Sequence, residues 1–451
     1  MAAVRSYRQS ISVASIWLVV VVAVGVITAG RGAFRALARR PAAAWSRRIS
    51  FWTKIGCLPT PPDMRAMSSS AFRFVLMIGV VNLFGDMTYE GGASINGQYL
   101  ASLGASAAAI SIIAGAAESL GYMLRAVSGY LADKTGKYWL ITFIGYAINT
   151  LAVPAMALAG NWQTASALIL AERTGRAIRK PTVEAMLSYS TGKHGKGWVY
   201  AVNTAMDETG ALLGPLLITA ALVMGAGFRK AYALLLISSL LVLMSLSIAR
   251  LSFPVPSRLE KGGPWTAHAS GFTRAYWLYM VAGGCFAAGV MSFEFISYHL
   301  SHLGLSEQLI PALLGLGTAS AIVATLILGR AYDRIGIAAV VIGVVLTSLF
   351  SPLVFFGSVP LAVTGLIFWG IGYAVQDTLL KALIASVLPE DRRNAAFGVF
   401  YLGYGGGWLM GSIAAGLLYG RSRLALVIFV VVVQLAAVPL FLLAARESRT
   451  T

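Results

Sequence analysis

The chain has 451 residues, of which 58% are hydrophobic and only 12% are charged. A soluble globular protein does not need so much apolar surface, so the composition excludes that class and indicates a polytopic membrane protein. The 35 Lys and Arg residues exceed the 17 Asp and Glu residues by 18, but they are scattered between apolar segments, which favours positive-inside loops over nucleic-acid binding.

The first 70 residues form a basic extension with one apolar run at 11–29, and three interpretations of it stay open. A cleaved signal peptide would leave the arginines after this run outside, against the charge rule, whereas an extra helix with an outer N-terminus satisfies that rule. The third interpretation is a start-site artefact, in which Met64 or Met67 begins a short cytoplasmic lead.

Twelve apolar runs of spanning length follow, since a membrane helix needs about 20 residues. A polar interval at 252–273 divides them into six and six. We therefore expect an all-α membrane protein with six-helix bundles at 71–251 and 274–446, a cytoplasmic linker between them and a tail at 447–451. The predicted spans are 72–100, 107–131, 138–159, 163–188, 198–223, 230–251, 275–300, 309–331, 337–357, 360–387, 395–419 and 424–445.

Basic residues in the short loops predict the orientation. With both ends of the twelve-helix core inside, the inner loops hold twelve Lys and Arg residues and the outer loops hold four, namely Arg229, Lys230, Arg421 and Arg423. This excess predicts a protein of the plasma (inner) membrane whose core begins and ends in the cytoplasm.

Three pairs of motifs repeat between the halves: GYLADKTGK at 129–137 and GRAYDRIGI at 329–337, GALLG at 210–214 and GWLMG at 407–411, and MTYE at 87–90 and MSFE at 291–294. Duplicated six-helix bundles are typical of transporters built from parallel repeats, in which the binding site lies between the halves at mid-membrane.

The motif at 129–137 resembles the loop signature of the major facilitator superfamily, Gly-x-x-x-Asp-Arg/Lys-x-Gly-Arg/Lys, and the motif at 329–337 is a degenerate second copy. FGDMTYE at 84–90 further resembles a prokaryotic subgroup of that family, whose substrate is unsettled. The resemblance implies a transporter fold that works as a monomer. It also implies a gating motif formed by Gly129, Asp133, Lys134, Gly136, Lys137, Gly329, Asp333, Arg334 and Gly336.

The gating motif has a physical explanation. We expect Gly129 to permit close helix approach, Gly136 to form a tight turn, and Asp133 to pair with nearby basic groups and latch the outward-facing state. A topology-fixing loop without a gating role is the alternative.

Eleven polar residues inside the predicted spans are candidates for proton coupling or substrate binding. A charge at the bilayer centre costs about 2.5–3.5 kcal/mol on insertion scales, so such residues are rare and usually functional. The candidates are Asp86, Glu90, Glu118, Arg125, Arg173, Asp207, Glu208, Glu294, Gln376, Asp377 and Lys381.

Helix geometry predicts partners for some of these charges. With a rise of about 1.5 Å per residue, Arg173 and Asp207 both lie about 15 Å into their helices. We therefore expect Arg173 to pair with Asp207 or Glu208, and Glu118 to pair with Arg125 on the same helix face. Arg173, Arg176, Lys180 and Glu184 form one stripe.

The two repeated glutamates, Glu90 and Glu294, are expected to face a shared outer vestibule, with Gly91, Gly92 and Gly97 weakening the helix just beyond Glu90. Fixed ion pairs that never titrate are the alternative to proton exchange at the acidic candidates. Our order of preference for the proton carrier is Asp207 or Glu208, then Asp86, then Glu90.

Two further features bear on how a solute is transported. Gly210, Gly214 and Pro215 partly resemble the helix 5 element of antiporters in the same superfamily, which favours export by exchange. The aromatic residues Tyr401, Tyr404 and Trp408 either line the path of an amphipathic solute or belong to tight helix packing.

No cofactor or metal is predicted. His299 and His302 lie on one helix face, and a metal site there would need a third ligand such as Glu307. Two cysteines, Cys57 and Cys285, and four histidines supply no nucleophile or metal cluster for an enzyme.

The sequence thus predicts a secondary active transporter that moves a small organic solute by alternating access, coupled to protons and favouring efflux. The alternatives are an uptake symporter or facilitator of the same fold and a non-transporting membrane receptor or scaffold. Its expected partners are the lipid bilayer, the solute and protons.

Overall fold

The computed structural model describes residues 70–188, 196–254, 272–386 and 393–450. The predictions for the N-terminal extension and for most of the linker lie outside these residues. The described residues belong to one compact unit, Ser70–Thr451, and they form helices without strands. The prediction of an all-helical protein is confirmed for this part of the chain.

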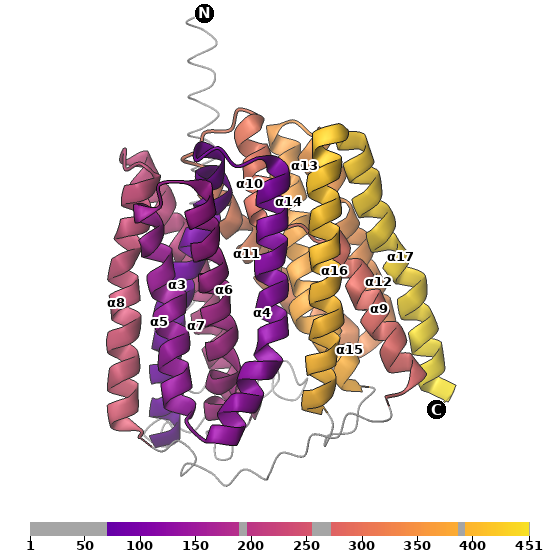
Figure 1. Ribbon diagram of the computed structural model, residues 1–451. Helices are drawn as coiled ribbons and strands as arrows, with labels where there is room; N and C mark the ends of the chain where they lie inside the picture. The colour runs from indigo at the N-terminus through magenta and orange to yellow at the C-terminus, as the bar shows by residue number, and fades with distance from the viewer. Residues whose placement is uncertain (1–69, 189–195, 255–271, 387–392, 451) are drawn as a thin grey trace, which may run out of the picture. The chain divides into compact units, whose positions relative to one another are not determined.

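The helices follow the predicted apolar runs closely (Figure 1). Their bounds in the first half are α3 Ser70–Ser102, α4 Ala107–Thr135, α5 Tyr138–Ala155 with the 3-10 turn η2 Met156–Leu158, α6 Trp162–Ser188, α7 Lys196–Val223 and α8 Phe228–Ser252. In the second half they are α9 Arg274–Gly289, α10 Phe293–His302, α11 Ile310–Ile335, α12 Ile337–Ser348, α13 Phe350–Phe356, α14 Val359–Ala374, the π-helix η4 Val375–Leu380, α15 Lys381–Ser386, α16 Arg393–Arg421 and α17 Arg423–Thr450.

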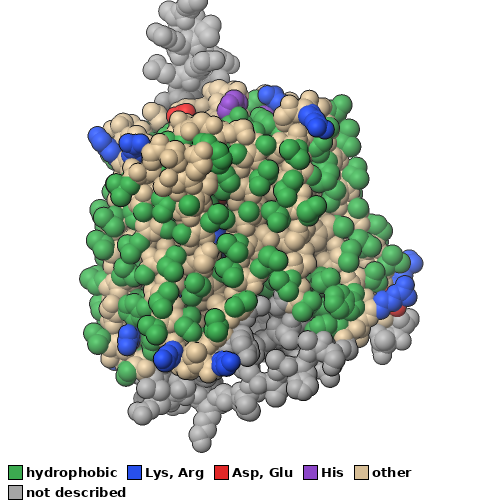
Figure 2. Space-filling model, viewed as in Figure 1, with side chains coloured by type: hydrophobic (Ala, Val, Ile, Leu, Met, Phe, Trp, Pro, Cys, Tyr) green, Lys and Arg blue, Asp and Glu red, His purple; other side chains and the backbone are tan. Residues whose placement is uncertain are grey.

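This is a multi-pass membrane protein. Nine helical stretches in the described ranges are long and apolar enough to cross a membrane. Figure 2 shows hydrophobic side chains over the flank of the helices, and lysine and arginine gathered at the two ends. A helix in lipid satisfies its own backbone hydrogen bonds, so an apolar flank with charged ends suits a bilayer.

The two ends of the helix bundle are named here by their connections. At the linker end, α8 ends at Ser252 and α9 begins at Arg274, and at the far end α3 ends at Ser102 and α10 ends at His302. Figure 1 shows the helices of 70–252 on one side and those of 274–450 on the other, with α4 and α16 adjacent between them.

Glycine pairs set the helix spacing in the same way in both halves. Cβ atoms on Gly210 and Gly214 of α7 would collide with the backbone of α3. Cβ atoms on Gly407 and Gly411 of α16 would collide with the backbone of α9. Small residues let helix backbones approach closely in membranes. The repeated motifs at 210–214 and 407–411 therefore occupy equivalent places, against the first helix of their own half.

The expectation of a weak helix beyond Glu90 is wrong, because α3 runs unbroken from Ser70 to Ser102. Its glycines pack against neighbouring helices, and Gly97 lies against the backbone of Glu294 in α10. This packing offsets the low helix propensity of glycine. The interruption occurs instead in the second half, where Val290–Ser292 separate α9 from α10.

Candidate functional site

A cavity of about 500 Å³ lies between the two halves, within the usual size range of small-molecule sites. Helices α3, α4, α6 and α7 line it from the first half, and α10, α11, α14, η4, α15 and α16 line it from the second. All eleven candidate residues identified in the sequence lie on its wall: Asp86, Glu90, Glu118, Arg125, Arg173, Asp207, Glu208, Glu294, Gln376, Asp377 and Lys381.

The cavity extends toward the linker end. Side-chain exposure increases along it, from 5% at Glu294 to 16% at Glu118 and 54% at Asp377, which lies near the linker end. At the far end the halves are in contact, because Ser111 of α4 donates from its hydroxyl to the Ser412 carbonyl at 2.7 Å. Glu90 and Glu294 line one shared cavity, as expected, and this cavity extends toward the linker end.

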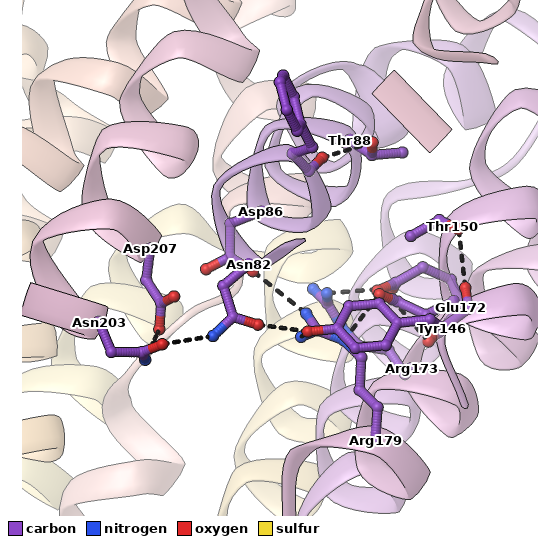
Figure 3. A network of polar contacts seen from close by, with 12 residues as sticks. Asn82, Asp86, Thr88, Tyr146, Thr150, Glu172, Arg173, Arg179, Asn203 and Asp207 are labelled. Atoms are coloured by element: carbon purple, nitrogen blue, oxygen red, sulfur yellow. Dashed lines mark hydrogen bonds and ion pairs between the residues drawn. The ribbon is translucent and has the colours of Figure 1, made fainter. Parts of the chain in front are cut away.

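A network of polar side chains crosses the first half from α7 to α6 (Figure 3). Asn203 donates to Asp207 at 3.3 Å, and Asn82 of α3 donates to Asn203 at 2.9 Å. The Tyr146 hydroxyl of α5 donates to Asn82 and accepts from Arg179 at 3.1 Å. One end of this network is a carboxylate with a spare acceptor, since Asp207 Oδ1 has no hydrogen-bond partner among the described residues.

Arg173 is the centre of a second network, which joins the halves. Its guanidinium lies 2.7 Å from Glu118 of α4, 3.1 Å from Glu172 of α6 and 3.5 Å from Glu294 of α10. All four side chains are at most 16% exposed. Because buried charges need partners, one arginine that faces three carboxylates makes a tightly coupled group.

Asn149 of α5 links the two networks. Its amide donates to Glu172 at 2.7 Å, and its oxygen accepts from Arg179 at 3.0 Å. Arg179 also forms an ion pair with Asp86 at 3.2 Å. A continuous line of hydrogen bonds and ion pairs thus runs from Asp207 in the first half to Glu294 in the second.

Part of these networks was not predicted from the sequence, namely Asn82, Tyr146, Asn149, Glu172 and Arg179. Arg179 lies next in sequence to residues of the predicted stripe of α6. Asn82 and Asn149 are polar residues inside apolar runs, and this pattern was the signal that could have identified them. Uncharged polar residues are common in membrane helices, so this signal is weak.

Both predicted pairings are wrong in this structure. Arg173 meets Glu118, not Asp207 or Glu208, because Gly210 and Gly214 bring α7 against α3 and not against α6. Arg125 does not pair with Glu118. Its guanidinium instead lies 4.8 Å from the Tyr122 ring centre and 5.8 Å from that of Tyr401.

Glu294 owes its position to the break between α9 and α10. It lies in the first turn of α10, where the helix dipole favours a negative charge. Two indole groups hold the non-helical residues: Trp369 donates to the Met291 carbonyl at 2.8 Å and Trp408 donates to the Ser292 hydroxyl at 3.2 Å. The break thus aims a carboxylate at Arg173.

The π-helix η4 presents Gln376 and Asp377 to the cavity. Gln376 donates to the Tyr122 hydroxyl at 2.5 Å and accepts from Tyr404 at 2.9 Å, which connects the halves at mid-height. Asp377 pairs with Lys381 at 3.1 Å. Short π-helical stretches are frequent at functional sites because they re-aim side chains.

The gating motif is described only in part. Gly136 ends α4 in the left-handed conformation with φ of 64°, and Gly336 ends α11 with φ of 57°, so both copies end on a positive φ that glycine favours. A Cβ on Gly129 would lie 3.5 Å from Pro181, an ordinary contact, so the expected close approach there is wrong. The Asp133 side chain lies outside the described part.

The two histidines at the end of α10 form hydrogen bonds with other groups of the protein. His299 contacts the Tyr419 hydroxyl at 2.9 Å and the Val354 carbonyl at 3.2 Å through its two ring nitrogens. His302 contacts the Tyr298 carbonyl at 2.8 Å. No cluster of metal-ligating side chains occurs in the described ranges.

Comparison with known proteins gives consistent matches. The family model of the Major Facilitator Superfamily matches residues 66–341 and 295–451. An uncharacterised protein of Mycobacterium tuberculosis is 32% identical over 375 residues, covering 82% of this chain and 92% of the relative. An uncharacterised MFS-type transporter of Methanocaldococcus jannaschii is 25% identical and covers 77% of this chain and 89% of its own length.

Solved structures share the fold at low sequence identity. The nucleoside transporter NupG superposes with a TM-score of 0.65 at 15% identity, covering 84% of this chain and 99% of the transporter. The peptide transporter POT superposes with a TM-score of 0.68 at 14% identity, covering 84% and 95%.

Proposed function

Because this chain belongs to the major facilitator superfamily and is a membrane transporter, not an enzyme, we propose that it moves a small organic solute by alternating access coupled to protons. In this proposal twelve helices form two six-helix bundles around the cavity, and the protein works as a monomer in the inner membrane. The linker end faces the cytoplasm, as the loop charges predict, so the conformation described here is open inward.

Charge imbalance in the cavity supports proton coupling. Eight carboxylates and six lysine or arginine side chains line the wall. An excess of negative charge inside a membrane protein requires compensation, and protons are the smallest cations that supply it. Fixed ion pairs alone would not leave acids in excess.

The proposal rests mainly on the surroundings of Asp207. It lies in α7 at the edge of the cavity, with one unpartnered oxygen and one weak hydrogen bond from Asn203 at 3.3 Å. It also begins the line of contacts that ends at Glu294 in the other half. A proton gained or lost at Asp207 therefore changes a network on which the contact between the halves depends.

We propose export by exchange as the direction, since the glycines of α7 match the antiporter-like element and pack against α3. Uptake by symport is the second candidate. Acids without an ion-pair partner lie on α3 and α7, and cations without one lie on α4 and α6. This separation favours symport, because a proton and an anion can then bind at the same time.

Transport in proteoliposomes tests the coupling. A solute is first selected by thermal-shift screening of the purified protein at two pH values. Asp207→Asn is expected to retain solute exchange without a gradient, but to reduce accumulation driven by a pH gradient at least about tenfold, because exchange needs no proton transfer.

Glu208→Gln tests the neighbouring acid, and Glu307→Gln is its matched control because Glu307 is exposed and lies outside the cavity wall. Solute accumulation by the wild-type protein that does not respond to a pH gradient would refute the coupling. If Asp207→Asn keeps its gradient-driven accumulation, Asp207 is not the proton carrier, and another residue has that role.

A further inference from the structure

Three cations on the cavity wall have no acid partner among the described residues: Arg125 of α4, and Arg176 and Lys180 of α6. The guanidinium of Arg176 lies 4.0 Å from the Tyr89 ring centre, and that of Arg125 lies 4.8 Å from the Tyr122 ring centre. Stacking on a ring uses the face of a guanidinium and leaves its N–H edges for a ligand.

Arg125 also carries a buried donor without a partner. Its Nε is inaccessible to solvent and makes no hydrogen bond in the described part of the chain. An unpaired buried donor costs about 1–3 kcal/mol, so this one indicates a missing acceptor.

Helix packing brings the three cations together. Arg176 and Lys180 are one turn apart on α6, so they share a face. The hydroxyl of Ser128 in α4 donates to the Ala177 carbonyl in α6 at 2.8 Å, which fixes Arg125, one turn away on α4, beside this face.

The acids of the cavity form no ion pair with this cluster in the described part of the chain. Glu118, Asp86 and Asp377 are each paired with another cation. The unmatched acids Glu90, Asp207 and Glu208 belong to α3 and α7, and none of them lies within ion-pair distance of the three cations, which belong to α4 and α6. Glu184 is exposed and likewise forms no ion pair with Lys180.

The second half contributes an aromatic wall to the cavity that holds these cations. Trp369, Tyr373 and Trp408 line the same cavity, and the rings of Trp369 and Tyr373 lie 4.6 Å apart. Aromatic side chains offer large apolar area to a ligand body, while guanidinium groups bind carboxylate or phosphate oxygens.

We infer that Arg125, Arg176 and Lys180 bind the anionic group of the transported solute, so the substrate is an organic anion, a carboxylate or phosphate monoester with an apolar body. The apolar body packs on Trp369, Tyr373 and Trp408. This inference rests on the proposed transport function and names its substrate class.

Thermal unfolding of the purified protein tests the inference with shape-matched probes. The probes are benzoate and phenyl phosphate as anions, benzamide as the neutral analogue, benzylammonium as the cation, and inorganic phosphate, all at equal ionic strength. We expect at least one aromatic anion to raise Tm by about 2 °C or more when it is well above its Kd, and benzamide to have a smaller effect.

The Tm shifts with benzoate and phenyl phosphate distinguish a carboxylate site from a phosphate site. A larger Tm shift with phenyl phosphate than with inorganic phosphate would show that the aromatic wall contributes to binding. Arg176→Gln and Arg125→Gln should each weaken anion binding at least about tenfold, as expected for a charge-assisted contact, whereas the exposed, distant Arg250→Gln should not. Equal shifts with benzoate and benzamide, a larger shift with benzylammonium, or no shift with any anion would overturn the inference.

The wild-type comparison of probes needs no variant, so a variant that does not fold leaves the test intact. Binding is measured without a pH gradient, which separates the two proposals. Anion binding that Arg176→Gln weakens, without gradient-driven transport, would refute the transport proposal alone. Gradient-driven transport of a neutral or cationic solute, unchanged in Arg176→Gln, would refute the anion site alone.

Discussion

Replacing Gly97 by alanine tests whether the far end opens during transport. Gly97 lies in α3 of the first half, and a Cβ there would collide with the backbone carbonyl of Glu294 and the hydroxyl of Ser297 in α10 of the second half. The collision exists only while the two halves touch at the far end. The substitution should therefore destabilise the conformation described here relative to one that is open at the far end.

The size of the effect follows from packing. An extra methyl group in a well-packed interface costs about 1–3 kcal/mol, and here the obstacle is backbone, which cannot rotate away. The higher helix propensity of alanine is worth about 1 kcal/mol, but it applies to both conformations because α3 stays helical in each. The population ratio should thus shift by about 5- to 150-fold toward the far-open state.

Spin-label distances provide the assay. Labels on Ser102→Cys and Gln308→Cys report the separation of the halves at the far end, since both positions are exposed there. The native cysteines are first changed by Cys57→Ser and Cys285→Ser.

Gly406→Ala is the matched control, because a Cβ on this helical glycine of α16 would meet no atom within 4 Å. We expect a longer distance population in Gly97→Ala only. If Gly97→Ala and Gly406→Ala both give the parent distribution, the contact between α3 and α10 does not control the far end.

Three more predictions concern the networks and the gate. Arg173→Gln should lower the free energy of unfolding by about 3–5 kcal/mol, because it leaves buried carboxylates without their cation. Adding Glu118→Gln should restore part of this loss. Strictly additive losses of the two substitutions would contradict the coupling. Tyr146→Phe should cost about 1–3 kcal/mol by leaving buried partners unsatisfied, whereas the control Tyr298→Phe should cost less, and equal losses would contradict this role. Asp133→Asn should change the far-end label distances, and unchanged distances would refute the proposed latch.

Much of the architecture was predictable from the sequence. Apolar runs of spanning length locate the helices, because lipid requires each span to be a closed hydrogen-bonded helix. The candidate residues of the cavity were also predictable, since charges inside such runs are costly and point inward. Asp207 and Arg173 were identified in this way, and both line the cavity.

Ion-pair partners were not predictable to the same degree. Depth along a helix gives the level of a residue but not its neighbours, which depend on which helices touch. Arg173 and Asp207 lie at similar depth, yet the glycines of α7 direct that helix to α3, and Arg173 reaches Glu118 and Glu294 instead. No local pattern in a single sequence indicates which helices touch one another.

The break between α9 and α10 explains how duplicated halves came to carry different chemistry. The glycine contacts relate Leu83 to Gly284 and Met87 to Ala288, each 201 residues apart, whereas Glu90 and Glu294 are 204 apart. The difference of three residues equals the non-helical segment Val290–Ser292.

In α3 the helix continues through Glu90, so this carboxylate stays on the wall of its own half. In the second half the three extra residues begin a new helix at Phe293 and place Glu294 in its first turn, facing Arg173 across the interface. A helix start both favours the negative charge and re-aims it. The break, and not the repeated Met-x-x-Glu motif itself, therefore brings Glu294 against Arg173 of the first half.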